Sequence, residues 1–110
     1  MLGGLSVGLQ PTSFEVPVMQ NEEPPFEYPR AAWKDRVGGE TLLRIHISPG
    51  GAVDSVLVEV SSGHRGLDSA AVVGARRLRY RPARRGGEPM AVWATLPVRY
   101  PMPAGMSGGP

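Results

Sequence analysis

The fold is decided by residues 40–60, which read ETLLRIHISPGGAVDSVLVEV. Leucine, isoleucine or valine recurs at every second position within residues 43–47 and again within residues 56–60. A period of two is typical of a strand that packs one face on a core. Pro49, Gly50 and Gly51 separate the two runs and supply the residues of a tight turn. The stretch therefore predicts an antiparallel hairpin whose inner face carries Thr41, Leu43, Ile45, Ile47, Val56, Val58 and Val60.

A helix is expected after this hairpin. Residues 61–66, SSGHRG, interrupt the second strand, and a stripe at helical spacing then begins at Leu67 and ends at Leu78. Asp68 near its start and the arginines near its end both suit the helix dipole. The stripe also contains small residues that let the helix lie close to a sheet, namely Ala70, Ala71, Gly74 and Ala75.

The remaining elements flank this hairpin and helix. Residues 29–37 predict a short helix with a proline at its start and two glycines after its end. Residues 84–89 predict a loop, and residues 90–100 predict a last strand whose inner side is Val92, Ala94, Leu96, Val98 and Tyr100. The expected fold is α+β: a three-stranded antiparallel sheet with two helices packed on one face.

Length and composition indicate one small domain. The chain has 110 residues, of which 41% are hydrophobic, enough for a single core. Glycine and proline gather near both ends, so we expect residues 1–24 to be a flexible lead or linker, residues 25–101 to be the folded domain, and residues 102–110 to be a flexible tail. The absence of cysteine excludes disulfides and thiolate metal sites. No apolar run reaches the roughly 18–20 residues that a membrane helix needs.

Pro97 falls inside the predicted last strand. Proline cannot donate to a strand ladder, so this strand should lie at an edge of the sheet. Residues 90–96 contain neither proline nor charge, and they therefore offer free main-chain groups to a partner strand.

A set of short motifs resembles the C-terminal domain of the TonB family in order and spacing. The motifs are Tyr28-Pro29, Gly39-Glu40-Thr41, Gly51-Ala52-Val53, Ser61-Ser62-Gly63, Leu67-Asp68-Ser69-Ala70-Ala71, Tyr80-Arg81-Pro82-Ala83, Gly87 and Leu96-Pro97-Val98-Arg99-Tyr100. They cover about residues 25–100. The resemblance implies a periplasmic energy-transducer domain that binds the TonB box of an outer-membrane transporter by strand addition and couples proton-motive force to transport.

The resemblance also implies site residues and partners. The peptide-binding residues carried over by position are Pro25, Phe26, Glu27, Tyr28, Met90, Ala91, Val92, Trp93, Ala94, Thr95 and Leu96. Further expected partners are inner-membrane proton-driven motor proteins, which full transducers reach through a membrane anchor. We expect that anchor to be absent from this chain. A scaffold or dimerisation domain of an envelope complex, a homodimer using the same edge, is the alternative function.

Other constellations favour no chemistry. Six arginines, Arg76, Arg77, Arg79, Arg81, Arg84 and Arg85, could mark a nucleic-acid surface, but no recognition motif accompanies them and we expect a solvated helix end instead. Ser61, Ser62, His64 and Asp68 share one loop without a nucleophile elbow, so we expect no enzyme. His46 and His64 are too few for a metal site, and no cofactor is expected. Trp93 is as consistent with packing as with contact to a peptide.

Overall fold

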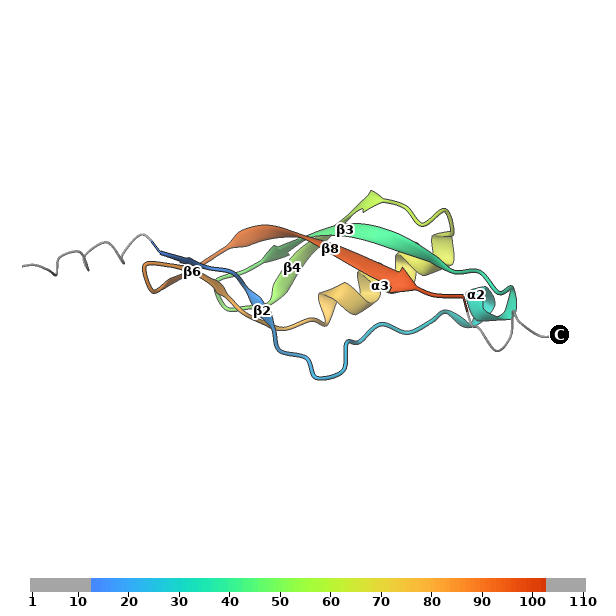
Figure 1. The fold of residues 1–110 in the computed structure, drawn as a ribbon, viewed down its shortest axis with the longest axis horizontal. Helices are drawn as coiled ribbons and strands as arrows, with labels where there is room; N and C mark the ends of the chain where they lie inside the picture. The colour runs from blue at the N-terminus through green and yellow to red at the C-terminus, as the bar shows by residue number, and fades with distance from the viewer. Residues whose placement is uncertain (1–12, 103–110) are drawn as a thin grey trace, which may run out of the picture.

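The computed structural model describes residues 13–102 and confirms the predicted hairpin. β3 (Gly39–Ile47) and β4 (Val53–Val60) pair antiparallel, and β8 (Val92–Tyr100) pairs antiparallel with the other side of β3. The strand order is therefore β4-β3-β8 (Figure 1). β8 lies at an edge, as the proline within it predicts.

One helix covers the inner face of this sheet. α3 (Arg65–Arg76) buries Leu67, Ala71, Gly74 and Ala75, the stripe predicted from the sequence. Opposite it lie the inward side chains of β3, where Leu43, Ile45 and Ile47 are at most 1% exposed. The helix can approach this closely because three of its four buried residues carry a methyl group or no side chain.

Two register shifts in β4 change which of its valines face the core. Val56 stands opposite Ile45 and Val58 opposite Leu43, but a shift between Leu42 and Leu43 places Val60 opposite Leu42 on the outer face. The prediction that Val60 shares a face with Val56 and Val58 is therefore wrong. A bulge adds one residue to a strand and reverses the facing of everything beyond it.

The first helix is shorter than predicted and lies elsewhere. α2 (Arg30–Lys34) sits at the end of the sheet beyond Tyr100, not beside α3 on its face (Figure 1). Tyr28 anchors this end, because its ring meets both Trp33 and Tyr100 with centroids 5.4 Å apart and its hydroxyl donates to the Val37 carbonyl at 2.5 Å. The expected packing of both helices on one face is thus wrong.

A second set of strands extends the molecule at the opposite end from α2 (Figure 1). The predicted single sheet is accompanied by two small ones, with orders β1-β6-β7 and β2-β5. Their members are β1 (Phe14–Glu15), β2 (Val18–Met19), β5 (Tyr80–Arg81), β6 (Ala83–Arg85) and β7 (Glu88–Met90). Residues 84–89 are therefore a hairpin rather than a loop, and residues 14–19 carry structure that the sequence pattern did not predict.

The lead segment and residues 79–86 form one interrupted ribbon. The pairings Phe14 with Arg85 and Met19 with Tyr80 belong to a single antiparallel register, in which Pro17 stands opposite Pro82. Neither proline has an N–H, so the ladder stops between them and resumes on either side. Residues 1–12 and 103–110 lie outside the described part of the chain, as does most of the predicted tail.

The hairpin turn docks on this ribbon through a glycine. Gly51 has φ +90°, and its carbonyl accepts the Tyr80 N–H at 2.8 Å. An added Cβ at Gly51 would overlap the Tyr80 carbonyl oxygen, so only glycine fits here. Two short strands that could not stand alone are thereby held against the main sheet.

Candidate functional site

The free edge of β8 is the leading candidate for a binding surface. Leu42 pairs with Pro97, and because proline lacks an N–H this pair is one of the non-hydrogen-bonded pairs of the ladder. The odd-numbered residues of β8 then turn their main-chain groups away from β3. Within residues 13–102 no strand takes up those groups from Trp93, Thr95 and Arg99, nor the Pro97 carbonyl.

The opposite edge of the sheet is less suited to accept a strand. β4 carries both register shifts and has Asp54 and Glu59 beside them. Bulges and charges are the devices by which proteins protect edges from unwanted pairing. β8 instead pairs with β3 over nine consecutive residues without a shift, and Val92–Leu96 carries no charge. Of the two edges, β8 is the regular one.

A groove runs beside the second half of β8. Its volume is about 450 Å³, and it lies between residues 96–99 of the strand and residues 19–26, which contribute Met19, Pro24 and Phe26. Phe26 is held in place by α3, because Gly74 leaves room for its ring and a Cβ there would overlap the ring. Residues 19–26 therefore form one wall of this groove, on the side of the sheet that α3 covers.

The structure brings together only part of the predicted peptide-binding set. Phe26 and Leu96 both line this groove. Pro25, Glu27 and Tyr28 line a different hollow, of about 480 Å³, against Ala70, Val73 and Gly74 of α3. Met90 belongs to β7 and pairs with Ala83, and Ala91 separates β7 from β8. The edge itself consists of Val92, Trp93, Ala94, Thr95 and Leu96, followed by four residues that continue it.

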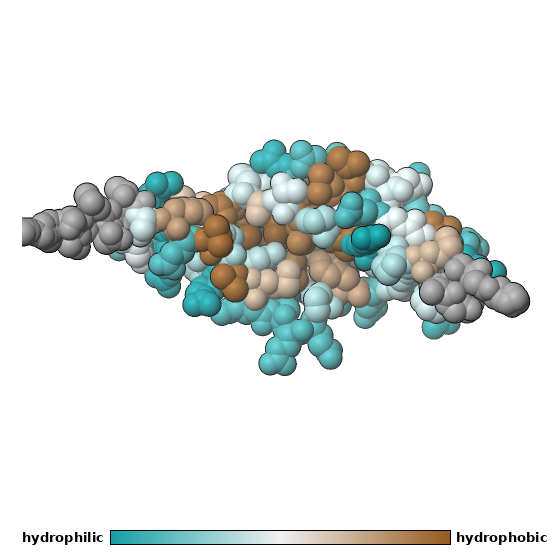
Figure 2. Space-filling view, in the orientation of Figure 1, coloured by the Kyte–Doolittle hydropathy of each residue, from teal (hydrophilic) through white to brown (hydrophobic). Residues whose placement is uncertain are grey.

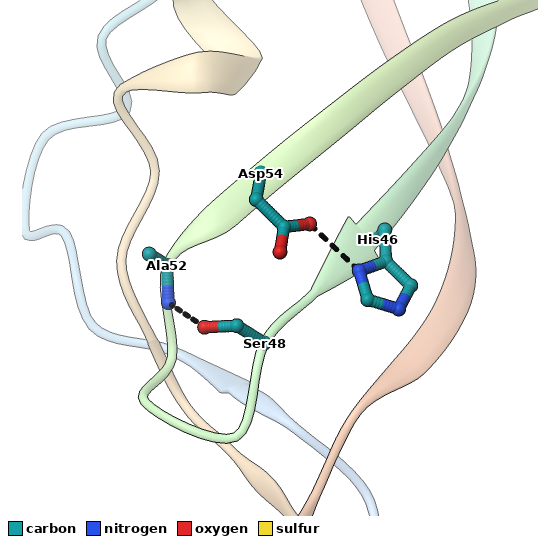
Figure 3. A network of polar contacts seen from close by, with 4 residues as sticks. All are labelled: His46, Ser48, Ala52 and Asp54. Carbon is teal, nitrogen blue, oxygen red and sulfur yellow. Dashed lines mark hydrogen bonds and ion pairs between the residues drawn. The ribbon is translucent and has the colours of Figure 1, made fainter.

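Trp93 lies on the outer face of the sheet and is held between two cationic or polar side chains. The Arg44 guanidinium carbon is 5.5 Å from the indole centroid, and the His46 ring centroid is 5.0 Å from it. His46 Nδ1 lies 2.6 Å from Asp54 Oδ1, which fixes the imidazole on this face (Figure 3). The indole is still 46% exposed. It is therefore positioned by its neighbours yet open to solvent.

The outer face carries other apolar side chains. Leu42 stands between Val60 and Pro97 in one row across the three strands, and Leu57 lies in the next row. Val60 and Leu57 are each 53% exposed. Figure 2 shows hydrophobic patches between polar ones on the side of the molecule seen in Figure 1. Sequence alternation could place Trp93 and His46 on this face, but only the register shows that they meet.

The polar residues of the loop before α3 support the fold. Ser62 donates its N–H and hydroxyl to Asp68 Oδ1, and Thr41 from β3 donates its hydroxyl to the same oxygen at 2.7 Å. Ser61 donates to the other oxygen. Burial alone would raise the pKa of Asp68, but these hydrogen bonds outweigh it and hold that pKa well below its usual range. His64 Nδ1 accepts the Gly66 and Leu67 amides, so it caps α3.

The arginine cluster is spread over several elements. Arg76 and Arg77 end α3, Arg79 and Arg81 flank the buried Tyr80, and two more lie in β6. Arg85 stacks on Phe14 with its guanidinium carbon 5.7 Å from the ring, and Arg84 donates to the Gly87 carbonyl. Part of the cluster therefore stabilises the ribbon.

Across residues 13–102, no three histidine or carboxylate side chains come together as a possible metal site. In the same part of the chain, no helix has the length and apolar character to cross a membrane.

The domain thus combines a sheet that has a regular free edge at β8, one helix on the inner face of that sheet, and residues 19–26 beside the edge strand. Residues 24–102 match the family described as Gram-negative bacterial TonB protein C-terminal. The chain belongs to this TonB C-terminal family. The resemblance noted in the sequence is thereby confirmed.

Relatives and a solved structure agree with this assignment. Protein tonB2 of Pseudomonas aeruginosa is 35% identical over 74 residues, which are 67% of this chain and 27% of that protein. Protein TonB of Xanthomonas campestris pv. campestris is 36% identical over 81 residues, covering 74% of this chain and 36% of that protein. The chain thus spans about a third or less of these relatives. The solution structure of the Pseudomonas aeruginosa TonB C-terminal domain has the same fold, with a TM-score of 0.65 at 24% identity over 78% of this chain and 86% of that one.

Proposed function

We propose that this domain is the receptor-binding part of a periplasmic energy transducer, which binds the TonB box of an outer-membrane transporter by strand addition at β8. The observation that carries the proposal is the regular, uncharged and unpaired edge from Val92 to Leu96. Membership of the TonB C-terminal family supplies the class of partner.

Affinity in this proposal comes mainly from the main chain. Trp93 and Thr95 each offer an outward N–H and carbonyl to a guest, and each hydrogen bond is worth about 0.5–1.5 kcal/mol net. Pro97 offers only a carbonyl, so the ladder weakens toward Arg99. Selectivity then depends on the alternate side chains of the guest, because main-chain pairing is indifferent to sequence.

Binding to an outer-membrane transporter would give the domain a role in energy transfer. In the proposal, inner-membrane motor proteins draw on the proton-motive force, and the work reaches the transporter through the strand held at β8. In the proposal the domain binds the transporter and catalyses no reaction. The polar groups of Ser62, His64 and Asp68 are engaged in hydrogen bonds that support the loop and α3.

The test is a titration of the isotopically labelled domain with a TonB-box peptide, followed by amide chemical shifts. We expect the largest shifts at residues 92–98 and near Phe26, which lines the groove beside this strand. Shifts confined to other parts of the domain would refute strand addition at β8.

A homodimer through the same edge is the competing use of β8. Sedimentation over a range of concentrations separates the two, because a monomer leaves the edge available to a peptide. An obligate dimer with Val92–Leu96 protected would favour a scaffold role.

A further inference from the structure

We propose that the strand accepted by β8 is an acidic peptide with two apolar side chains three residues apart, one on each face of the added strand. This inference rests on the proposed function, since it names the chemistry of the guest at that edge. The features that carry it are the groove beside Leu96, the exposed indole of Trp93 and the unpaired charge of Arg44.

The inner-facing contact is the groove next to Leu96. In a sheet, residues directly opposite on neighbouring strands share a face, so a guest residue opposite Leu96 points toward the helical layer. The space that it enters is bounded by Met19 and Phe26. Apart from Arg99 at its rim, the groove is lined by apolar or proline side chains. An apolar guest side chain is therefore buried there, whereas a polar one is left without a partner.

The outer-facing contact is Trp93. A guest residue opposite Trp93 shares its face and meets an indole that is 46% exposed. Arg44 and His46 lie against this ring at 5.5 and 5.0 Å, so it is already held in position before a guest arrives. Preorganised aromatic surface favours an apolar or aromatic contact at low entropic cost.

Arg44 is the reason for an acidic residue in the guest strand. It stands in the same row as Thr95, and its guanidinium leans toward the edge over Trp93. The single ion pair among the described residues joins His46 and Asp54, so Arg44 has no carboxylate partner there. A glutamate opposite Thr95 lies on the outer face within reach of this guanidinium. The net charge of +2 for the whole chain also favours an acidic guest.

The spacing follows from the register. Positions opposite residues 93 and 96 are three apart, so they fall on opposite faces about 10 Å from each other along the strand. Two apolar residues placed two or four apart share one face and can make only one of the two contacts.

The experiment uses end-blocked peptides of eight residues with identical composition. The matching pair, Thr-Thr-Leu-Thr-Glu-Leu-Thr-Thr and its reverse, covers both directions of strand addition. The control, Thr-Leu-Thr-Glu-Thr-Leu-Thr-Thr, has its leucines four apart. We expect one matching peptide to bind about tenfold more tightly than the control, as measured by amide shifts of the labelled domain.

Two variants assign the contacts. Trp93→Thr keeps a strand-forming residue on an exposed face and should remove most of the advantage of the matching peptide. Arg44→Gln should remove the preference for glutamate over glutamine in that peptide.

Equal affinities for matching and control peptides, with shifts along residues 92–98, would overturn this inference and leave the proposed function standing. An absence of shifts along β8 with these peptides and also with the TonB-box peptide would overturn both.

Discussion

The rings of Tyr28 and Tyr100 meet edge to face with centroids 5.4 Å apart, yet within residues 13–102 only one of the two hydroxyls has a partner. Tyr28 donates to the Val37 carbonyl at 2.5 Å, whereas the hydroxyl of Tyr100 is buried and makes no hydrogen bond within residues 13–102. Burial also raises the pKa of Tyr100. The two tyrosines therefore share one ring contact but differ in hydrogen bonding, because one hydroxyl is satisfied and the other is not.

Replacing each tyrosine by phenylalanine should therefore give opposite results. Tyr100→Phe removes an unsatisfied buried hydroxyl, and we expect the free energy of unfolding to rise by about 1 kcal/mol. Tyr28→Phe loses a hydrogen bond, and we expect a fall of about the same size. Urea unfolding measures both, and changes of the same sign in the two variants would contradict this assignment.

Thr95→Pro should impair peptide binding while the fold survives. Its outward N–H is lost but the pairing with β3 is not, because Pro97 already occupies the equivalent position two residues later. We expect binding of a TonB-box peptide to weaken about tenfold or more. Thr95→Ala keeps the N–H and is the matched control, for which the affinity should change little. Equal affinity in the proline variant would mean that the guest does not pair with this edge.

Gly74→Ala should destabilise the domain despite the higher helix propensity of alanine. A Cβ at this position comes within 2.8 Å of the Pro25 carbonyl oxygen and also meets the Phe26 ring, so these two residues must move. We expect a loss of about 1–3 kcal/mol from overpacking, against a gain of about 1 kcal/mol from propensity. Gly50→Ala is the control, since its Cβ would meet only Ser48 Oγ at 3.8 Å. A Gly74 variant as stable as the wild type would show that the segment yields easily.

Acid should destabilise the domain through Asp68. The folded state holds the pKa of Asp68 below its ordinary value of 3.8, so this carboxylate contributes stability above that pH and loses it as the pH falls further. We expect Asp68→Asn to be less stable at pH 7 by about 1–2 kcal/mol and to lose less stability between about pH 5 and pH 3 than the wild type. Asp35→Asn, at an exposed position, is the comparison. Parallel pH profiles for wild type and the Asp68 variant would contradict this role.

The main sheet and α3 could be predicted because each depends on local pattern. The alternation of apolar and polar residues predicts which faces of β3 and β8 point inward. The apolar stripe that begins at Leu67 predicts α3. Pro97 placed β8 at the edge, because the missing N–H is visible in the sequence itself.

The features that were missed depend on partners distant in the sequence. β1, β2 and β5 have two residues each, too few for a periodic signal, and they exist only because residues 13–20 meet residues 79–86. The register shift that turns Val60 outward likewise has no signature in β4 alone. The groove beside Leu96 contains Phe26 and Leu96, two of the peptide-binding residues that the resemblance implies. Met19 and Pro24 also line it, because the ribbon brings their segment past β8, and no local pattern indicates this.

The opposed prolines at positions 17 and 82 have a mechanical consequence. They divide the ribbon into two short clamps, one joining β1 to β6 and the other joining β2 to β5. Under tension the first clamp can open while the second still holds, because no hydrogen bond crosses the proline pair. A load applied at Ser13 would therefore be released in two stages, and the wall of the groove at Phe26 would move only after both clamps had opened.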